Sequence, residues 1–206
     1  MSEDRIRSVL IVDDEADACE NLRDILTDLG YRVDTARNGL QAIDLISRTA
    51  YDIALLDLKM PGMDGLSVYR KMKQLQPETV AIVVSAFAGS ELADRAIQEG
   101  ASRLVAKPVD MPHLLQAIEG SLAQPLVLVV DDDDDFCENL WQLLKAHDYR
   151  PALARSVREA RRQLTGKRID FTVMPLNLWP SSCDATSHDG LLRSPPKGAK
   201  PVSRTI

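Results

Sequence analysis

The chain has 206 residues, 45% of them hydrophobic and 27% charged, as expected of a soluble protein with one full domain and a smaller addition. The net charge of -6 argues against a nucleic-acid-binding surface, so we expect no nucleic-acid partner. No apolar stretch approaches the roughly 20 residues needed to cross a membrane, and the charged N-terminus does not resemble a signal peptide, so we expect a cytoplasmic protein without a membrane partner.

Short apolar runs alternate with segments of helical period over the first 122 residues. A continuously apolar run that is too short for a helix indicates a strand buried on both faces. The alternation therefore predicts an α/β fold with a doubly wound parallel sheet of five strands. The predicted order is strand 9–12, helix 15–29, strand 32–36, helix 39–49, strand 52–56, helix 65–75, strand 80–84, helix 89–98, strand 103–106 and helix 111–122.

The chain then repeats itself at a shift of 118 residues. The shift places Val9 to Asp14 on Val127 to Asp132, and Cys19-Glu20-Asn21-Leu22 on an identical stretch that begins at Cys137. A shared unit that is present twice explains this match better than chance. The second copy predicts strand 127–130, helix 134–147, strand 151–154, helix 156–165 and strand 169–174.

The second copy does not finish. Pro175 stands where the repeat requires the counterpart of Asp57, and the remaining residues are rich in proline and serine without a sustained apolar period. Two explanations stay open: a degenerate remnant that leans on the first unit, or a reading frame lost near residue 175. We expect a first domain over residues 1–123, an incomplete second α/β unit over 124–174 and a disordered tail over 175–206.

The apolar runs of the first unit end on polar residues, and in a parallel sheet such ends converge on one site. Three carboxylates at one place repel each other, and a divalent cation resolves the conflict. Oxygen ligands without histidine or cysteine point to Mg²⁺, with one or two carboxylates as direct ligands. The residues at these ends are Asp13, Asp14, Asp57, Ser85 and Lys107.

The same residues suit phosphoryl transfer. A carboxylate such as Asp57 can attack a phosphoryl group and form an aspartyl phosphate. Mg²⁺, the Lys107 ammonium and the Ser85 hydroxyl would each bind one of the three equatorial oxygens. Singly, Asp13 or Asp14 could be a helix cap and Lys107 a surface lysine. Their joint occurrence at the required strand ends favours the phosphoacceptor hypothesis.

Residues 8 to 122 closely resemble the receiver domain of bacterial two-component response regulators. The resemblance implies a flavodoxin-like sheet with strand order 2-1-3-4-5. It also implies that this is a signalling phosphoacceptor, which promotes its own phosphorylation and dephosphorylation, rather than an enzyme. The motifs that carry it are Asp13-Asp14, Asp57 with Met60-Pro61 and Asp64-Gly65, Ser85-Ala86, and Lys107-Pro108.

In such a receiver, Asp57 accepts the phosphoryl group of a phosphohistidine on a sensor histidine kinase or phosphotransfer protein. The resemblance further implies that Asp13, Asp14, Asp57 and the backbone carbonyl of Lys59 organise Mg²⁺. Ser85 is then the switch hydroxyl and Lys107 the phosphate-binding cation. The bond between Lys107 and Pro108 is expected to be cis, as it is in the family.

The chain departs from the family at Leu104, where the usual switch aromatic is missing; this puts the coupling to the output in doubt, not phosphorylation. With Pro175 in place of the acceptor, we expect the second unit not to accept phosphate. The acidic run Asp131 to Asp135 is either a remnant of the acid site or, as we favour, a solvated helix start.

No helix-turn-helix, cyclase or methylesterase segment follows residue 122, so we expect an output through contact with an unknown downstream protein rather than through DNA. An alternative is a phosphate-independent docking or adaptor module that retains the fold, against which intact Asp57 and Lys107 argue. A haloacid-dehalogenase-type phosphatase also forms an aspartyl phosphate, but it requires an acid two residues after the nucleophile, where this chain has Lys59.

Overall fold

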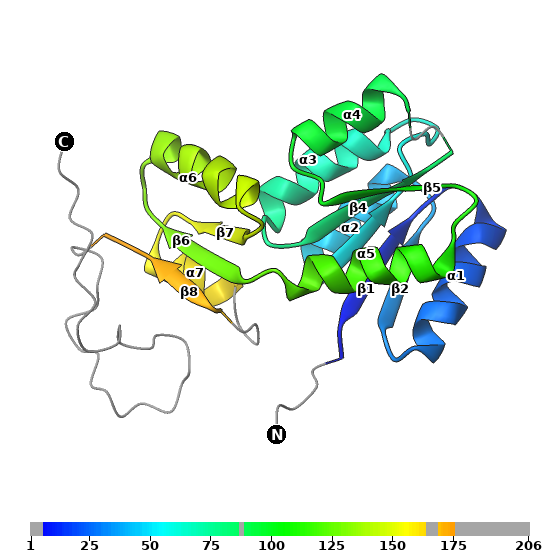
Figure 1. The fold of residues 1–206 in the computed structure, drawn as a ribbon, viewed down its shortest axis with the longest axis horizontal. Coiled ribbons are helices and arrows are strands. Elements are labelled where there is room, and N and C mark those ends of the chain that lie inside the picture. Colours follow the sequence, from blue (N-terminus) through cyan, green and yellow to red (C-terminus); the bar gives the residue numbers. More distant parts are fainter. Residues whose placement is uncertain (1–5, 87–88, 164–168, 176–206) are drawn as a thin grey trace.

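The computed structural model describes residues 6–86, 89–163 and 169–175 (Figure 1). The tail predicted to be disordered therefore lies, beyond Pro175, outside the described residues. The first unit contains the ten predicted elements, each within two residues of its predicted bounds. They are β1 (Ser8–Val12), α1 (Ala16–Asp28), β2 (Arg32–Ala36), α2 (Gly39–Arg48), β3 (Ile53–Leu56), α3 (Gly65–Leu75), β4 (Val80–Ser85), α4 (Glu91–Gln98), β5 (Arg103–Ala106) and α5 (Met111–Ala123).

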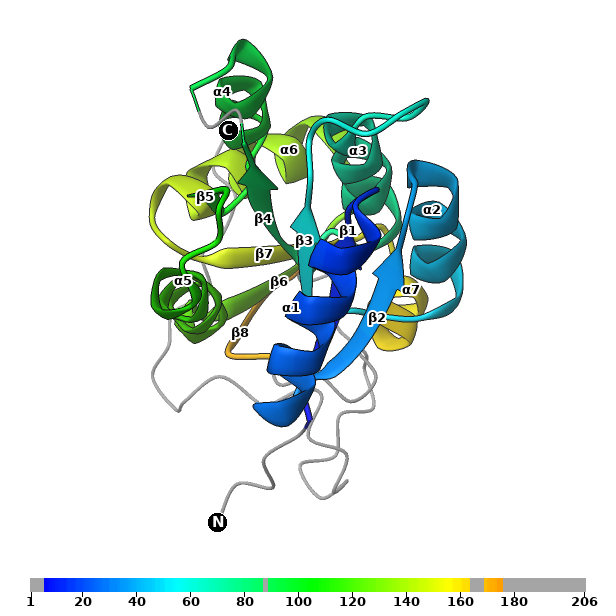
Figure 2. The same cartoon turned by 90° about the vertical axis from the view of Figure 1, so that its right-hand side faces the viewer.

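The five strands pair in parallel in the order β2-β1-β3-β4-β5, which confirms the predicted flavodoxin-like sheet. Successive side chains of a strand face opposite sides of the sheet. Accordingly Val9 and Ile11 join a core cluster that α1 and α5 cover, whereas Leu10 and Val12 join a cluster on the face of α2, α3 and α4. Figure 2 shows the sheet between these two helical layers.

A second, smaller sheet follows α5. Its elements are β6 (Leu126–Val130), α6 (Asp134–Ala146), β7 (Arg150–Ala154), α7 (Val157–Gln163) and β8 (Phe171–Val173). The strands are parallel in the order β7-β6-β8, which is the order β2-β1-β3 of the first unit shifted by 118 residues. The predicted incomplete second α/β unit is therefore confirmed, with a third strand shorter than expected.

The repeat extends to single hydrogen bonds. In the first unit the Asp52 carboxylate accepts the Ser8 N–H at 2.9 Å, and in the second the Asp170 carboxylate accepts the Leu126 N–H at 2.9 Å. Asp148 takes the left-handed conformation, with φ of 59°, at the position equivalent to Gly30, where φ is 87°. The second unit is thus built on the same local contacts as the first.

The described part of the second unit, up to Pro175, stops where the first would continue with its fourth strand. Phe171 is 57% exposed on β8, whereas Ile53 at the equivalent position of β3 is fully buried. Ile53 lies in the core cluster that α1 and α5 cover, with β3 flanked by β1 and β4, whereas among the described residues β8 pairs only with β6. A sheet of three strands therefore leaves an apolar residue of its last strand in contact with solvent.

The second unit packs against the first through α6, which lies beside α3 and α4 in Figure 1. Trp141 of α6 is only 1% exposed. The Lys73 Nζ lies 3.5 Å from the centroid of the Trp141 ring, and the Lys145 Nζ lies 5.6 Å from it. Burial lowers the pKa of Lys145 from 10.5 to about 8, with further lowering by the charges of Arg150 and Lys73.

The lowered pKa of Lys145 makes the contact between the units dependent on pH. Because the folded pKa of about 8 lies below the unfolded value of 10.5, charging Lys145 costs stability at neutral pH, and this cost disappears as the pH rises from about 8 toward 10.5. We expect Lys145→Met to raise the free energy of unfolding by about 1–2 kcal/mol at pH 7, with a gain that vanishes near pH 10.

Urea denaturation at a series of pH values measures this difference between the variant and the parent. Lys71→Met, at an exposed position of α3, is the control and should show no gain at pH 7 that fades with rising pH. A pH-independent difference between Lys145→Met and the parent would contradict the prediction.

Candidate functional site

The acidic residues lie where β1 and β3 end, at the carboxyl edge of the first sheet. The ladder continues one residue past each strand, because the Asp13 N–H donates to the Ala36 carbonyl at 3.0 Å and the Asp57 N–H to the Val12 carbonyl at 2.8 Å. These bonds fix the backbone from which both carboxylates project. Asp13 and Asp57 are buried and Asp14 is exposed, so the cluster opens to solvent on one side.

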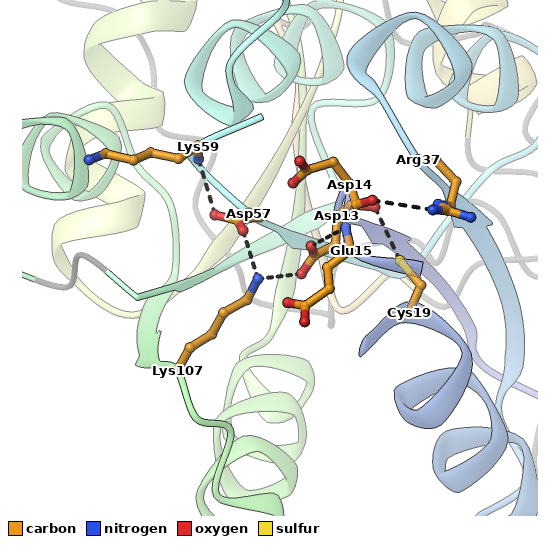
Figure 3. Close-up of polar contacts among 8 residues, drawn as sticks. All are labelled: Asp13, Asp14, Glu15, Cys19, Arg37, Asp57, Lys59 and Lys107. Atoms are coloured by element: carbon orange, nitrogen blue, oxygen red, sulfur yellow. Dashed lines mark hydrogen bonds and ion pairs between the residues drawn. The ribbon is translucent and has the colours of Figure 1, made fainter. Parts of the chain in front are cut away.

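Lys107 bridges two of these carboxylates. Its Nζ lies 2.6 Å from Oδ2 of Asp13 and 2.7 Å from Oδ2 of Asp57, and Figure 3 shows both carboxylates turned toward it. Burial by itself lowers the pKa of Lys107, but the hydrogen bonds with Asp13 and Asp57 outweigh it and raise the pKa. The side chain therefore stays a cation and holds the two carboxylates in place.

The carboxylates of Asp13, Asp14 and Asp57 form a group with the chemistry of a divalent-cation site. One oxygen from each lies within 4.8 Å of the others. Lys107 supplies a single positive charge against three negative ones, so the cluster carries excess negative charge. A set of oxygen donors that is partly open to water fits Mg²⁺, which retains several of its waters in protein sites. No other group of three potential ligands is present in the part of the chain that the structure describes.

The turn after Asp57 shapes the rim of the site. The Lys59 N–H donates to Oδ1 of Asp57 at 3.1 Å, while the Lys59 side chain points away from the acidic cluster (Figure 3). Gly62 follows with φ of 82°, a conformation that favours glycine. Asp64 then caps α3 by accepting the Ser67 N–H at 2.7 Å. The turn thus holds one oxygen of Asp57 through a backbone N–H, while Lys107 holds the other.

Gly65 explains why the motif needs glycine at the start of α3. A Cβ atom at this position would overlap the Asp57 carbonyl oxygen, and the Gly65 N–H donates to the Leu58 carbonyl at 3.1 Å. The first turn of α3 therefore packs directly on the backbone of Asp57.

Ser85 and Lys107 come from the neighbouring strands β4 and β5. Ser85 is fully buried as the last residue of β4, and its carbonyl accepts the Lys107 N–H at 3.0 Å. The peptide bond between Lys107 and Pro108 is cis. Leu104 of β5 packs against the core cluster on the face of α2, α3 and α4. Four of the five predicted site residues are thus linked by the ion pairs and the carboxylate group above, and Ser85 lies at the same edge.

Two supporting residues were not assigned to the site from the sequence. The Cys19 Sγ donates to the Asp13 carbonyl at 3.2 Å, and the Arg37 Nη2 donates to the Asp14 carbonyl at 3.4 Å (Figure 3). Burial raises the pKa of the Cys19 thiol to about 11, so it is protonated at neutral pH. Cys19 also belongs to the core cluster that α1 and α5 cover. The repeat held a signal for the contact with the Asp13 carbonyl, because Cys19 recurs as Cys137. The Cys137 Sγ contacts the Asp131 carbonyl at 3.5 Å in the same way.

The acidic run of the second unit is used as a helix start. Asp133 caps α6 by accepting the Phe136 N–H at 2.9 Å, and Asp134 in the first turn pairs with Arg155 at 2.6 Å. Asp131 accepts the N–H of Asp133 at 3.0 Å. Pro175 offers no carboxylate at the position of Asp57. These contacts support the helix-start interpretation that the sequence favoured.

Comparison with known proteins identifies the family to which the chain is similar. Residues 9–119 match the family model described as the response regulator receiver domain. A response regulator receiver protein of Anaeromyxobacter sp. (strain Fw109-5) is 34% identical over 157 residues, which cover 76% of this chain and 66% of that protein. Sporulation initiation phosphotransferase F of Bacillus subtilis (strain 168) is 32% identical over 111 residues, covering 54% of this chain and 90% of that protein.

Among solved structures, the chain is similar to response regulator protein TrrA from Thermotoga maritima in complex with Mg²⁺-BeF. The TM-score is 0.50 at 30% sequence identity, covering 55% of this chain and 97% of that one. The chain spans between 26% and 66% of the length of the first curated relatives that it matches. None of the helices in the described segments is long and apolar enough to cross a membrane.

Lys107 is the residue whose removal should change the electrostatics of the site most clearly. Lys107→Met leaves the buried carboxylates of Asp13 and Asp57 without their shared cation, so without divalent cations we expect the free energy of unfolding to fall by about 2–4 kcal/mol. Mg²⁺ should restore more stability in this variant than in the parent, because the ammonium no longer competes for the same oxygens.

Urea denaturation with and without Mg²⁺ measures both effects, and Lys59→Met, whose side chain points away from the cluster, is the matched control. Equal stabilisation by Mg²⁺ in Lys107→Met and in the parent would show that the ammonium and the metal do not share ligands.

Proposed function

Since this chain belongs to the response regulator receiver domain family of two-component systems, we propose that its Asp57 accepts a phosphoryl group from a histidine kinase or phosphotransfer protein. The observation that carries the proposal is the position of Asp57. Its carboxylate is held by Lys107 at 2.7 Å and by the Lys59 N–H at 3.1 Å, within a cluster of three carboxylates. The acceptor would lie in the domain over residues 1–123.

In the proposed step, an oxygen of the Asp57 carboxylate attacks the phosphorus of a phosphohistidine. A P–O bond forms while the P–N bond breaks, and the electron pair of that bond remains on the imidazole nitrogen. The two hydrogen bonds on Asp57 restrict its rotation and present the carboxylate in one orientation. Positioning of this kind supplies much of the rate enhancement in phosphoryl transfer, because the protein contributes little covalent chemistry.

The other groups of the site would stabilise the negative charge of the transferred phosphoryl group. Mg²⁺, when bound by Asp13, Asp14, Asp57 and the backbone carbonyl of Lys59, supplies positive charge to one phosphoryl oxygen. Lys107 is already at the edge of Asp57 and would turn its ammonium from the carboxylate to a second oxygen. The Ser85 hydroxyl would bind the third. The similar TrrA protein, which was crystallised in complex with Mg²⁺-BeF, supports the choice of Mg²⁺ as the metal.

The modified state would be recognised by another protein. We propose that phosphorylation of Asp57 changes a protein-interaction surface of the receiver and that the second unit, with Pro175 at the acceptor position, takes no phosphoryl group. The chain spans only part of the length of the relatives, so the downstream protein contact is likewise proposed and not taken over from them.

Phosphorylation by a small donor tests the proposal directly. The full chain is incubated with acetyl phosphate and Mg²⁺, and its intact mass is followed. We expect one phosphoryl group per chain, dependent on Mg²⁺ and abolished in Asp57→Asn. The double variant Asp13→Asn/Asp14→Asn should lose most of the adduct, because it removes the other two carboxylates of the cation site.

The repeat provides a matched control for this experiment. Asp131→Asn/Asp132→Asn changes the equivalent pair in the second unit and should leave the adduct unchanged. An adduct that persists in Asp57→Asn would identify a different acceptor. The absence of an adduct on folded protein would favour a phosphate-independent docking module instead.

A further inference from the structure

The contact between the two units, called the joint below, has features that neither the repeat nor the acidic site explains. It brings together Lys73, Glu78 and Gly100 of the first unit and Glu138, Trp141 and Arg150 of the second. Trp141, its central residue, is buried to 1% but belongs to neither core cluster of the second sheet. Its ring lies under the Lys73 ammonium of α3, at 3.5 Å from the ring centroid. The same lysine pairs with Glu138 of α6 at 3.6 Å. Trp141 is therefore buried by the first unit rather than by its own sheet.

The opposite side of the joint is Gly100, which follows α4 with φ of 105°. A Cβ atom at this position would overlap the six-membered ring of Trp141. The contact therefore depends on glycine for both the backbone conformation and the space. Arg150 of β7 adds a second connection, because its Nη2 donates to the Glu78 carbonyl at 3.3 Å in a buried position.

The joint is specific to the second unit. At the position equivalent to Trp141 the first unit has Arg23, whose side chain is 42% exposed and pairs with Asp24. Two of the differences between the copies have opposite consequences. The second unit has proline in place of the acceptor aspartate, and a buried tryptophan in place of an exposed arginine. Loss of the acceptor coincides with a contact that fixes the unit to its neighbour.

The joint lies at the start of the strands whose other ends form the site. Glu78, which receives Arg150, lies two residues before β4, and β4 ends at Ser85. Gly100, which receives Trp141, lies three residues before β5, and β5 leads directly to Lys107. The Ser102 N–H donates to the Ala81 carbonyl at 2.7 Å and so links the two strand starts. The strands that deliver Ser85 and Lys107 are thus both held at their other ends by the second unit.

We propose that the second unit is a docked regulatory segment, which the state of Asp57 controls through β4 and β5 and which in turn tunes the affinity of the site. This inference rests on the proposed phosphoacceptor function of Asp57. A phosphoryl group on Asp57 takes Lys107 away from the carboxylate that now holds it. The displacement of Lys107 moves the end of β5, and the Gly100 turn carries the change to Trp141. Because such coupling is reciprocal, a change at the joint alters binding at the site.

Fluorescence of Trp141 tests the first direction. In the full chain with Trp179→Phe, Trp141 is the single tryptophan. Beryllofluoride with Mg²⁺ serves as the phosphoryl mimic, and ¹⁹F NMR reports its binding independently. We expect the emission of Trp141 to change saturably, with the same midpoint as the bound ¹⁹F signal.

Two glycine variants test the reverse direction. Gly100→Ala pushes against Trp141, whereas Gly30→Ala places the same substitution at a positive φ after α1, with no atom within 4 Å of the new Cβ. The two substitutions share the backbone strain but not the contact. We expect Gly100→Ala to change the apparent affinity for beryllofluoride by at least about fivefold, and Gly30→Ala to leave it unchanged. Trp141→Phe, followed by ¹⁹F NMR, gives the same test if Gly100→Ala does not fold.

The outcomes separate this inference from the function on which it rests. A bound ¹⁹F signal with unchanged Trp141 emission, and with the parent affinity in Gly100→Ala and Trp141→Phe, would overturn the coupling and leave the phosphoacceptor function intact. No bound ¹⁹F signal on folded protein would overturn both.

Discussion

The structure depends on how the negative charges at the carboxyl edge of the parallel sheet are balanced. Parallel pairing brings the ends of β1 and β3 together, and with them the carboxylates of Asp13, Asp14 and Asp57 within 4.8 Å. Such a cluster is unfavourable unless cations balance it. Lys107 supplies part of the balance and leaves the rest to a divalent ion. The same excess of negative charge that is costly in isolation suits this edge to a divalent cation such as Mg²⁺.

The sequence predicted those features that depend on local pattern and on topology. Strand ends, the first unit's helices and the convergence of Asp57 and Lys107 follow from apolar runs and from the rule that ligands bind at the carboxyl ends of parallel strands. The joint around Trp141 did not follow, because its neighbours Lys73 and Gly100 belong to the other unit. No periodicity within α6 shows which surface will cover a residue on its flank. Arg37 was missed because its contact is with a backbone carbonyl, which leaves no pattern in side-chain types.

The second unit shows which contacts a shortened sheet retains. It keeps the strand order of the first unit, the Asp170 bond that ties β8 to β6, and the Cys137 contact beneath its acidic loop. In the residues that the structure describes, its three strands and two helices form a core near the lower size limit for an independent domain, and Phe171 is exposed. Burial of Trp141 against the first unit adds apolar contact that this small core lacks. Docking therefore has a role in stability, whether or not it also transmits a signal.

The side chain at position 104 bears on how a structural change at the acidic site could pass through β5. An aromatic side chain at this position could rotate between a buried and an exposed state, but Leu104 packs against the core cluster on one face of the sheet. With that side chain packed against the core, the proposed coupling would carry a movement of Lys107 through the strand backbone rather than through a rotating ring. The backbone of β5 leads to the Gly100 turn, where a single ring of the second unit is in contact. Leu104 in place of an aromatic and the contact of Trp141 with the Gly100 turn thus fit one proposal, in which the change would leave through the end of β5 instead of through its face.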